Sequence, residues 1–378
     1  MEQKNTPKYT KKQKWQIAAK ITALCLIVAI IVSYMNDVFN YPNNHVYIRR
    51  YQTFLELEEN SVDAVYIGSS VVDRSWIAAK AFNDYGMTVY PYASNKLHLT
   101  MPKFMIEEVL RTQDPDLFII DISCYPSDPK LEYPASRVRR IVDHMPLTKN
   151  KLEAIQYARK YLEGAEGYEY DASWYLPFIK YHGRWDYMDN DIVPLTKADF
   201  ENGTSRYMGA FTDKGKTGRI TPQEYPTVVS DTLQIPETSE EILRDFLDYA
   251  KELENKTGKK FLFVKAPCAL SEKEMSEFNY CFDIVDEYGF DYINFNTDKM
   301  YEKVGVDFDI HFYDKSHLNA VGAMNYTEYF SKYLKEKYDL PDHRGADNYE
   351  NWQTAYYNYL ELYDTLWDED EKLLINQK

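Results

Sequence analysis

Residues 117–122 most restrict the fold of this 378-residue chain, because the segment Leu-Phe-Ile-Ile-Asp-Ile is apolar at nearly every position. A strand that is apolar on both faces has to be covered on both sides, as in a parallel sheet between helices. Short segments with strand character also lie at 64–67, 87–92, 260–264 and 292–295. Helical patterns separate most of these segments, so the sequence predicts an α/β fold built on a parallel sheet.

The helices between these segments carry start and stop signals. Ser271 and Glu274 have the spacing of a capping box, and residues 238–241 repeat that pattern ahead of a helix expected to close at Gly258. A long helix is expected at 319–338, and the pattern predicts a main domain over residues 61–338. The acidic, aromatic tail at 339–378 is expected to contain a terminal helix.

Residues 125–237 interrupt the alternation of strands and helices. They hold one clear helical pattern, at about 148–162, followed by segments rich in aromatic residues and glycine. We interpret them as an insertion that folds against the sheet. It either covers the edge where ligands would bind or is a plain elaboration of the core.

The N-terminus predicts a membrane anchor. Residues 1–14 contain five lysines and a single acid, Glu2, and a mostly apolar run follows at 15–35. About 20 apolar residues span a bilayer core, and a lysine excess before the span keeps that side in the cytoplasm. The alternative is a cleaved signal peptide, but no clear small-x-small cleavage site follows the run. We therefore expect a single-pass anchor, a juxtamembrane linker at 36–60 and an extracytoplasmic domain.

The composition restricts the kinds of molecule that the chain is expected to bind. The formal net charge is −16 although the leader is basic, so the rest of the chain would repel nucleic acid. The 35 tyrosines either stack on sugars or serve ordinary packing. Cys25 lies in the apolar run, and Cys124, Cys268 and Cys281 show neither metal-ligand spacing nor a disulfide framework. No metal and no cofactor are expected.

The first chemical motif is Gly68-Ser69-Ser70, which directly follows the apolar segment 64–67. Ligands of parallel α/β sheets bind beyond the carboxyl ends of the strands, where this turn would lie. A serine hydroxyl becomes a nucleophile when a neighbouring base takes its proton. Ser70 is the predicted nucleophile and Ser69 its competitor; a simple N-cap is the structural alternative.

The second motif is Asp314-Lys315-Ser316-His317, ahead of the helix expected at 319–338. His317 would act as general base and Asp314 would orient it. Asp309 and His311 form a second candidate pair in a more strand-like alternation. All four side chains could be a metal set, but the serine scheme explains them better.

In their order, separation and context, these motifs resemble the SGNH/GDSL hydrolase superfamily over about residues 62–335. The resemblance is closer to the membrane-anchored bacterial branch that works beside membrane-bound O-acyltransferases on cell-surface polymers. It implies a three-layer, flavodoxin-like parallel sheet and a catalytic set of Ser70, Asp314 and His317.

Two features of the resemblance concern further residues. The usual oxyanion-hole glycine and Gly-x-Asn-Asp segment are not evident, which leaves the Ser70 N–H and the Asn95 amide as candidate donors. Asn95 as a turn residue is the alternative. The segment Tyr181-His182-Gly183-Arg184-Trp185 is similar to one in Gram-positive members. His182 and Arg184 are therefore candidate binding residues for a sugar or an anion, or else a structural pair.

The sequence thus predicts an extracytoplasmic serine-type acyl-ester enzyme that works through an acyl-serine. Together with the anchor, the resemblance implies an O-acetyltransferase or an acetylesterase that acts on a cell-surface or secreted polysaccharide, with a membrane-bound O-acyltransferase as a candidate partner. The alternative is a non-catalytic polysaccharide-binding or assembly protein on the same fold.

Overall fold

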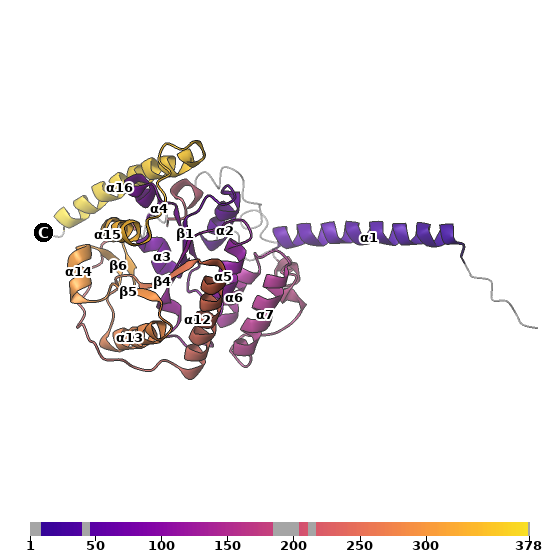
Figure 1. The fold of residues 1–378 in the computed structure, drawn as a ribbon, viewed down its shortest axis with the longest axis horizontal. Helices are drawn as coiled ribbons and strands as arrows, with labels where there is room; N and C mark the ends of the chain where they lie inside the picture. Colours follow the sequence, from indigo (N-terminus) through magenta and orange to yellow (C-terminus); the bar gives the residue numbers. More distant parts are fainter. Residues whose placement is uncertain (1–8, 40–45, 184–203, 211–216, 377–378) are drawn as a thin grey trace, which may run out of the picture.

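A five-stranded parallel sheet forms the centre of the computed structural model, which describes residues 9–39, 46–183, 204–210 and 217–376 (Figure 1). Its spatial order is β2-β1-β3-β4-β5. The strands are β1 (Ala64–Gly68), β2 (Val89–Ala93), β3 (Leu117–Asp121), β4 (Lys260–Lys265) and β5 (Asp291–Asn294). The predicted α/β class and parallel sheet are confirmed, and the strand order is that of flavodoxin-like folds.

Two layers of helices cover the sheet. On one face, Tyr66 of β1 packs against Phe330, and the helices of this layer contact one another. They are α3 (Ser70–Ser75), α4 (Ala78–Tyr85), α15 (Ala320–Tyr338) and α16 (Glu350–Asn376). On the other face, Phe263 of β4 packs against Phe246. That layer holds α5 (Pro102–Val109), α12 (Glu237–Thr257) and α13 (Glu272–Glu287).

The helix starts were predicted with mixed success. The capping box of Ser271 and Glu274 opens α13 as expected. The one expected at residues 238–241 is wrong, because α12 already begins at Glu237, directly after Pro236. Ser239 therefore lies within the first turn, and its hydroxyl donates to the Ser127 carbonyl oxygen at 2.8 Å.

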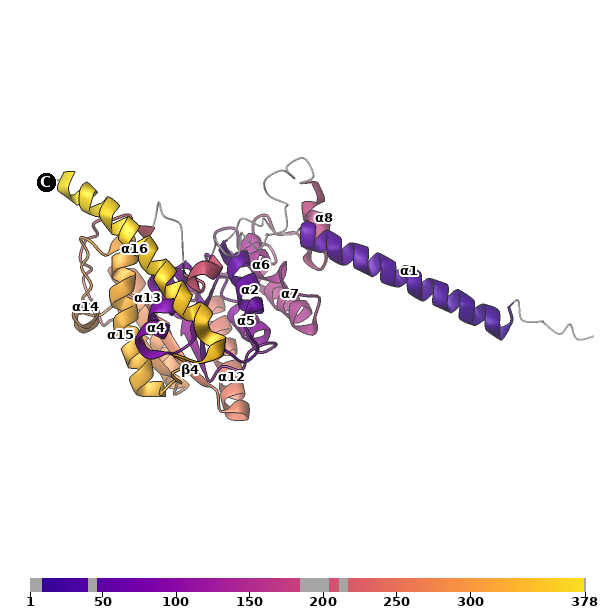
Figure 2. The same cartoon turned by 90° about the horizontal axis from the view of Figure 1, so that it is seen from above.

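Helix α1 (Lys11–Val38) lies near the N-terminus and is both long enough and apolar enough to cross a membrane. It extends away from the sheet in both views (Figure 1 and Figure 2). Its C-terminal end contacts α8 (Phe178–Tyr181), where the Phe178 N–H donates to Asn36 Oδ1 at 3.1 Å.

Segments on both flanks of the expected domain belong to its packing. Residues 36–60 contain α2 (Val46–Glu56), which contacts β2 and buries Phe54 against Tyr92. At the other end, Trp352 of α16 is buried and stacks on Phe82. The core thus extends beyond residues 61–338 in both directions.

The insertion lies mostly beside α5. Helix α7 packs on α5, and α6 packs on α7. The described elements of the insertion are α6 (Pro134–Val142), α7 (Lys149–Leu162), η2 (Ala172–Trp174), α8 and η4 (Thr204–Tyr207). The remaining short elements are η1 (Ile122–Cys124), α14 (Asp298–Val304), η5 (Asp347–Tyr349) and a separate antiparallel pair, β6 (Phe312–Asp314) with β7 (His317–Leu318).

Candidate active site

The turn after β1 brings Ser70 to the carboxyl edge of the sheet. At Gly68, a Cβ would lie 2.5 Å from Val72 Cγ2 and 2.6 Å from Asp121 Cβ, so only glycine lets α3 begin this close to β3. Ser69 is the N-cap, and its hydroxyl accepts from the Val71 N–H at 3.4 Å. Ser70 then becomes the first helical residue. Because β1 lies between β2 and β3, this turn is at the topological switch point of the sheet, where ligands bind.

The β6–β7 hairpin holds the second half of the site. Asp314 and His317 are directly paired across it, and the Ser316 N–H donates to Asp314 Oδ1 at 2.8 Å. Asn319 caps α15 through the Gly322 N–H and also donates from Nδ2 to the Ile310 carbonyl oxygen at 2.7 Å. The hairpin is therefore fixed to the start of a long helix.

The loop after β4 supports this hairpin from the interior. The Ala269 N–H donates to the Lys315 carbonyl oxygen at 2.7 Å. The Cys268 thiol donates to the Ser316 carbonyl oxygen at 3.3 Å and accepts from Lys265 Nζ at 2.9 Å. Burial raises the pKa of Cys268, although Lys265 opposes that shift, so the thiol keeps the proton that it donates.

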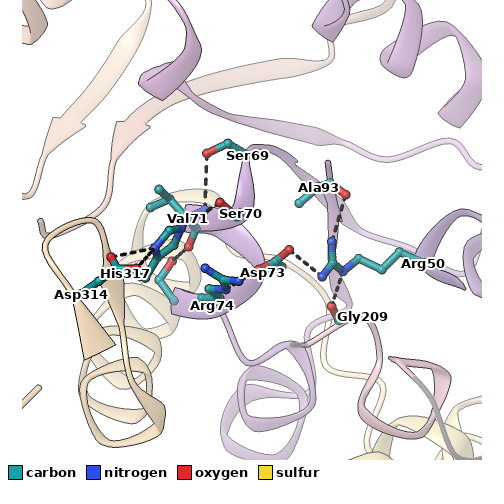
Figure 3. Close-up of polar contacts among 11 residues, drawn as sticks. Arg50, Ser69, Ser70, Val71, Asp73, Arg74, Ala93, Gly209, Asp314 and His317 are labelled. Atoms are coloured by element: carbon teal, nitrogen blue, oxygen red, sulfur yellow. Dashed lines mark hydrogen bonds and ion pairs between the residues drawn. The ribbon is translucent and has the colours of Figure 1, made fainter. Parts of the chain in front are cut away.

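Ser70, His317 and Asp314 form a continuous hydrogen-bonded relay (Figure 3). Ser70 Oγ lies 2.8 Å from His317 Nε2, across 247 residues of sequence. His317 Nδ1 lies 2.9 Å from Asp314 Oδ1 and 3.0 Å from Oδ2. An ionised carboxylate only accepts, so Nδ1 carries the proton and Nε2 is free to accept from the serine hydroxyl. This is the arrangement that an activated serine nucleophile requires.

The surroundings keep Asp314 ionised. Partial burial would raise its pKa, but the hydrogen bond from His317, the Ser316 N–H and the charge of Arg74 together hold that pKa below its usual value. The Tyr313 ring stacks on the His317 imidazole, with centroids 5.1 Å apart. The Arg74 guanidinium carbon lies 4.8 Å from the centroid of that tyrosine.

The loop after β2 lies beside the Gly68-Ser69-Ser70 turn and contains Asn95, the predicted oxyanion donor. The Ser94 N–H donates to the Gly68 carbonyl oxygen at 3.0 Å, and the Asn95 carbonyl oxygen accepts from Arg140 Nη1 at 2.7 Å. Within the described part of the chain, Asn95 Oδ1 and the Ser94 hydroxyl are buried without a hydrogen-bond partner. In the first turn of α3, the Val71 and Val72 N–H groups donate to Ser69, whereas the Ser70 N–H precedes the first intrahelical bond. Polar groups of two elements thus lie at this edge, and no sequence motif marks Ser94.

Among the other predicted residues, those that the structure describes make contacts outside the relay. His182 is exposed at the end of α8, where Nδ1 bonds the Ile179 carbonyl oxygen at 2.8 Å, and Arg184 lies outside the described residues. In the second candidate pair, His311 Nδ1 accepts from the Asp307 N–H at 2.9 Å, while Asp309 is exposed. The described residues contain no group of three or more His, Cys, Asp or Glu suited to a metal.

His98 fixes the far end of the loop after β2. Its ring nitrogens bond the Thr100 hydroxyl and the Pro129 carbonyl oxygen, each at 2.8 Å. Burial lowers the pKa of His98 to about 3; the bond to Pro129 opposes that shift and the charge of Arg137 adds to it. The folded protein therefore holds this ring neutral at pH values where the unfolded chain would protonate it.

This depressed pKa predicts acid destabilisation. The unfolded chain binds more protons between pH 6.5 and 3, so stability is present above that window and is lost as pH falls through it. From pH 6.5 to 5 the loss from His98 should reach about 1.6 kcal/mol. Thermal unfolding midpoints across this range should fall less in His98→Gln than in the parent. An equal fall would show that His98 does not cause it.

Compared with known proteins, the chain matches no protein-family model, and no curated protein is similar to it in sequence.

Proposed function

We propose that the chain is a serine-type acyl-ester enzyme of the SGNH/GDSL type, held at the outer face of a membrane by α1. The observation that carries this proposal is the relay from Ser70 Oγ through His317 to Asp314, with distances of 2.8 and 2.9 Å. A serine with only a surface or capping role is not expected to hydrogen-bond to an imidazole that a carboxylate already orients.

In the proposed reaction, His317 Nε2 takes the Ser70 hydroxyl proton while Oγ bonds to the ester carbonyl carbon. The resulting oxyanion would accept from the Ser70 N–H and from a donor of the loop at Ser94 and Asn95. Collapse breaks the bond to the leaving alcohol, which receives the proton from His317 and departs. An acyl group then remains on Ser70.

The second half of the reaction decides between two activities. If His317 deprotonates a water, the acyl group leaves as an acid and the protein is an esterase. If it deprotonates a polymer hydroxyl, the acyl group forms a new ester and the protein is an O-acyltransferase. The helix α1 favours transfer to a cell-surface polysaccharide, because a tethered domain stays beside a membrane-bound O-acyltransferase that could supply acyl groups.

A cavity of about 400 Å³ between α6, η2 and α8 supports a polymeric acceptor. Its walls combine rings with carboxylates, the usual contacts of sugars; they include Tyr133, Trp174, Tyr181, Glu166 and Glu169. Tyr133 is 84% exposed, so its ring has free area for stacking. It directly precedes α6, which reaches the loop after β2 through the bond from Arg140 to Asn95.

Tyr133→Ala is expected to weaken polysaccharide binding without changing the chemical step at Ser70. The variant should keep the parent kcat on a small acetyl-ester reporter, because Tyr133 does not contact the relay. Its KM for an acetylated polysaccharide should rise several-fold, in line with about 1 kcal/mol for one stacked ring. Initial rates on both substrates check this. An unchanged KM for the polysaccharide would remove this cavity from the acceptor path.

The decisive experiment for the activity uses the full chain in detergent or nanodiscs. Hydrolysis of an acetyl-ester reporter, with an acylated Ser70 found by intact-mass and peptide analysis, supports the enzyme. Polysaccharide binding without an acyl-serine and without turnover would instead favour the non-catalytic binding protein.

A further inference from the structure

Arg50 is a fully buried charge on α2, the helix nearest to the membrane anchor in sequence. Its guanidinium makes three polar contacts (Figure 3). Nη2 lies 2.5 Å from Asp73 Oδ2, Nη1 donates to the Ala93 carbonyl oxygen at 3.1 Å, and Nε donates to the Gly209 carbonyl oxygen at 2.9 Å. Neither side chain of the Arg50–Asp73 ion pair is exposed to solvent.

Two of these contacts reach elements that carry the proposed active site. Asp73 lies one turn after Ser70 in the same short helix, α3. Ala93 is the last residue of β2 and is followed directly by Ser94 and Asn95. Arg50 therefore connects the nucleophile helix to the loop that holds the oxyanion candidates.

The third contact extends the connection to the insertion. Gly209 has a φ of +83°, and a Cβ there would lie 2.9 Å from the Pro91 ring, so glycine is required for this close approach. Its carbonyl oxygen reaches Arg50 Nε. One side chain from α2 thus joins α3, the end of β2 and residues 204–210.

Stability alone is a poor explanation for this ion pair. Replacing a buried ion pair by well-packed apolar residues is often neutral or stabilising, whereas removing one partner is costly. Burial raises the pKa of Asp73, and Arg50 is the largest influence that opposes the shift, so the carboxylate depends on its partner. The planar fork of arginine can bond in several fixed directions at once, which neither an apolar pair nor a lysine can reproduce.

We propose that Arg50 is a positioning residue for the acyl-transfer site, which makes the membrane-proximal helix α2 a part of the catalytic unit. This inference rests on the proposed function. Arg50 holds α3 against the end of β2. It thereby sets the distance between Ser70 and the hydrogen-bond donors of the loop at Ser94 and Asn95, which would bind the oxyanion. The reaction is sensitive to this distance, because a misplacement of about 1 Å can cost on the order of 10²-fold in rate.

The test compares four full-length variants: Arg50→Lys, Asp73→Asn, the apolar double variant Arg50→Met with Asp73→Leu, and Arg244→Lys. Arg244 is a control, because it forms ion pairs with Glu240 and Glu287 at the surface of α12. Three quantities are measured: kcat and KM on an acetyl-ester reporter, the rate of covalent labelling by a fluorophosphonate, and the thermal unfolding midpoint.

Arg50→Lys should lower kcat and the labelling rate together by about 10–100-fold, with KM within about threefold of the parent. Asp73→Asn should act in the same direction, and Arg244→Lys should match the parent in kcat and labelling. The double variant is the critical arm. It should regain the parent unfolding midpoint, or most of it, without regaining kcat.

Two outcomes overturn the inference and leave the function intact. Either the Arg50 variants are as active as the parent, or the double variant recovers kcat and stability together, in which case Arg50 has a merely structural role. If the parent protein itself neither turns over the ester nor reacts with the fluorophosphonate, the proposed function fails and this inference fails with it.

Discussion

Ser70→Ala is expected to abolish fluorophosphonate labelling and to reduce turnover of an acetyl-ester reporter by at least about 10³-fold. The reason is that Ser70 Oγ is the hydroxyl hydrogen-bonded to His317 Nε2. Its removal leaves the base without a nucleophile to activate, and no acyl-enzyme can form. Peptide mass analysis after incubation with the ester should find the acyl group on Ser70 in the parent and on no serine in the variant.

Ser69→Ala is the matched control, because it removes the neighbouring hydroxyl of the same turn. That hydroxyl caps α3 through the Val71 N–H at 3.4 Å, and loss of such a cap costs roughly 0.5–2 kcal/mol of stability. The variant should therefore unfold at a lower temperature but keep most of its turnover and labelling. Labelling that persists in Ser70→Ala and disappears in Ser69→Ala would move the nucleophile to Ser69.

The sheet could be predicted because most of its strands are buried on both faces, the exception being the edge strand β5. In β1 and β3 every residue is buried, and in β4 all but the first are, so the apolar segments 64–67, 117–122 and 260–264 stood out from the helical pattern. The relay could be predicted for a related reason. Parallel strands share one carboxyl edge, so the turn after β1 could only end at the edge where ligands bind.

Other features depend on contacts that sequence spacing does not encode. The sequence predicts a juxtamembrane linker at residues 36–60, and nothing in its spacing indicates that Arg50 would reach Asp73 and Ala93. The N-cap of α12 was misplaced for a local reason. The Thr-Ser-Glu-Glu pattern fits a capping box, but Pro236, with φ −52°, is the N-cap, and the helix begins at Glu237.

Of the two residues in the candidate oxyanion loop, the sequence indicated Asn95 but not Ser94. Asn95 is a candidate because it follows a predicted strand, and the hydrogen bond from the Ser94 N–H to the Gly68 carbonyl oxygen does bring that loop beside the Gly68-Ser69-Ser70 turn. Ser94 has no motif to mark it. Only its burial, with a hydroxyl that lacks a partner among the described residues, sets it apart from an ordinary turn serine.

Asp314→Asn is expected to lower kcat on the reporter ester by about 10²–10⁴-fold, with little change in KM. Asp314 Oδ1 accepts from the Ser316 N–H, and both carboxylate oxygens lie within 3.0 Å of His317 Nδ1. In the amide, the oxygen can keep the bond to Ser316, while the NH₂ group faces Nδ1 and favours the tautomer protonated on Nε2. That tautomer cannot accept the Ser70 proton. The variant also lacks the negative charge that would stabilise the imidazolium ion of the transition state.

Asp309→Asn provides the control for this prediction, since it makes the same change on an exposed carboxylate five residues away in the rejected pair. It should match the parent in kcat, KM and unfolding midpoint. Because its neighbours hold the pKa of Asp314 below the usual value, the parent keeps Asp314 ionised throughout the assayed range of pH 6 to 9. A deficit of Asp314→Asn that is constant from pH 6 to 9 therefore reflects the lost charge and the tautomer. Equal activity of the two variants would show that Asp314 does not orient the base, and the relay would reduce to Ser70 and His317 alone.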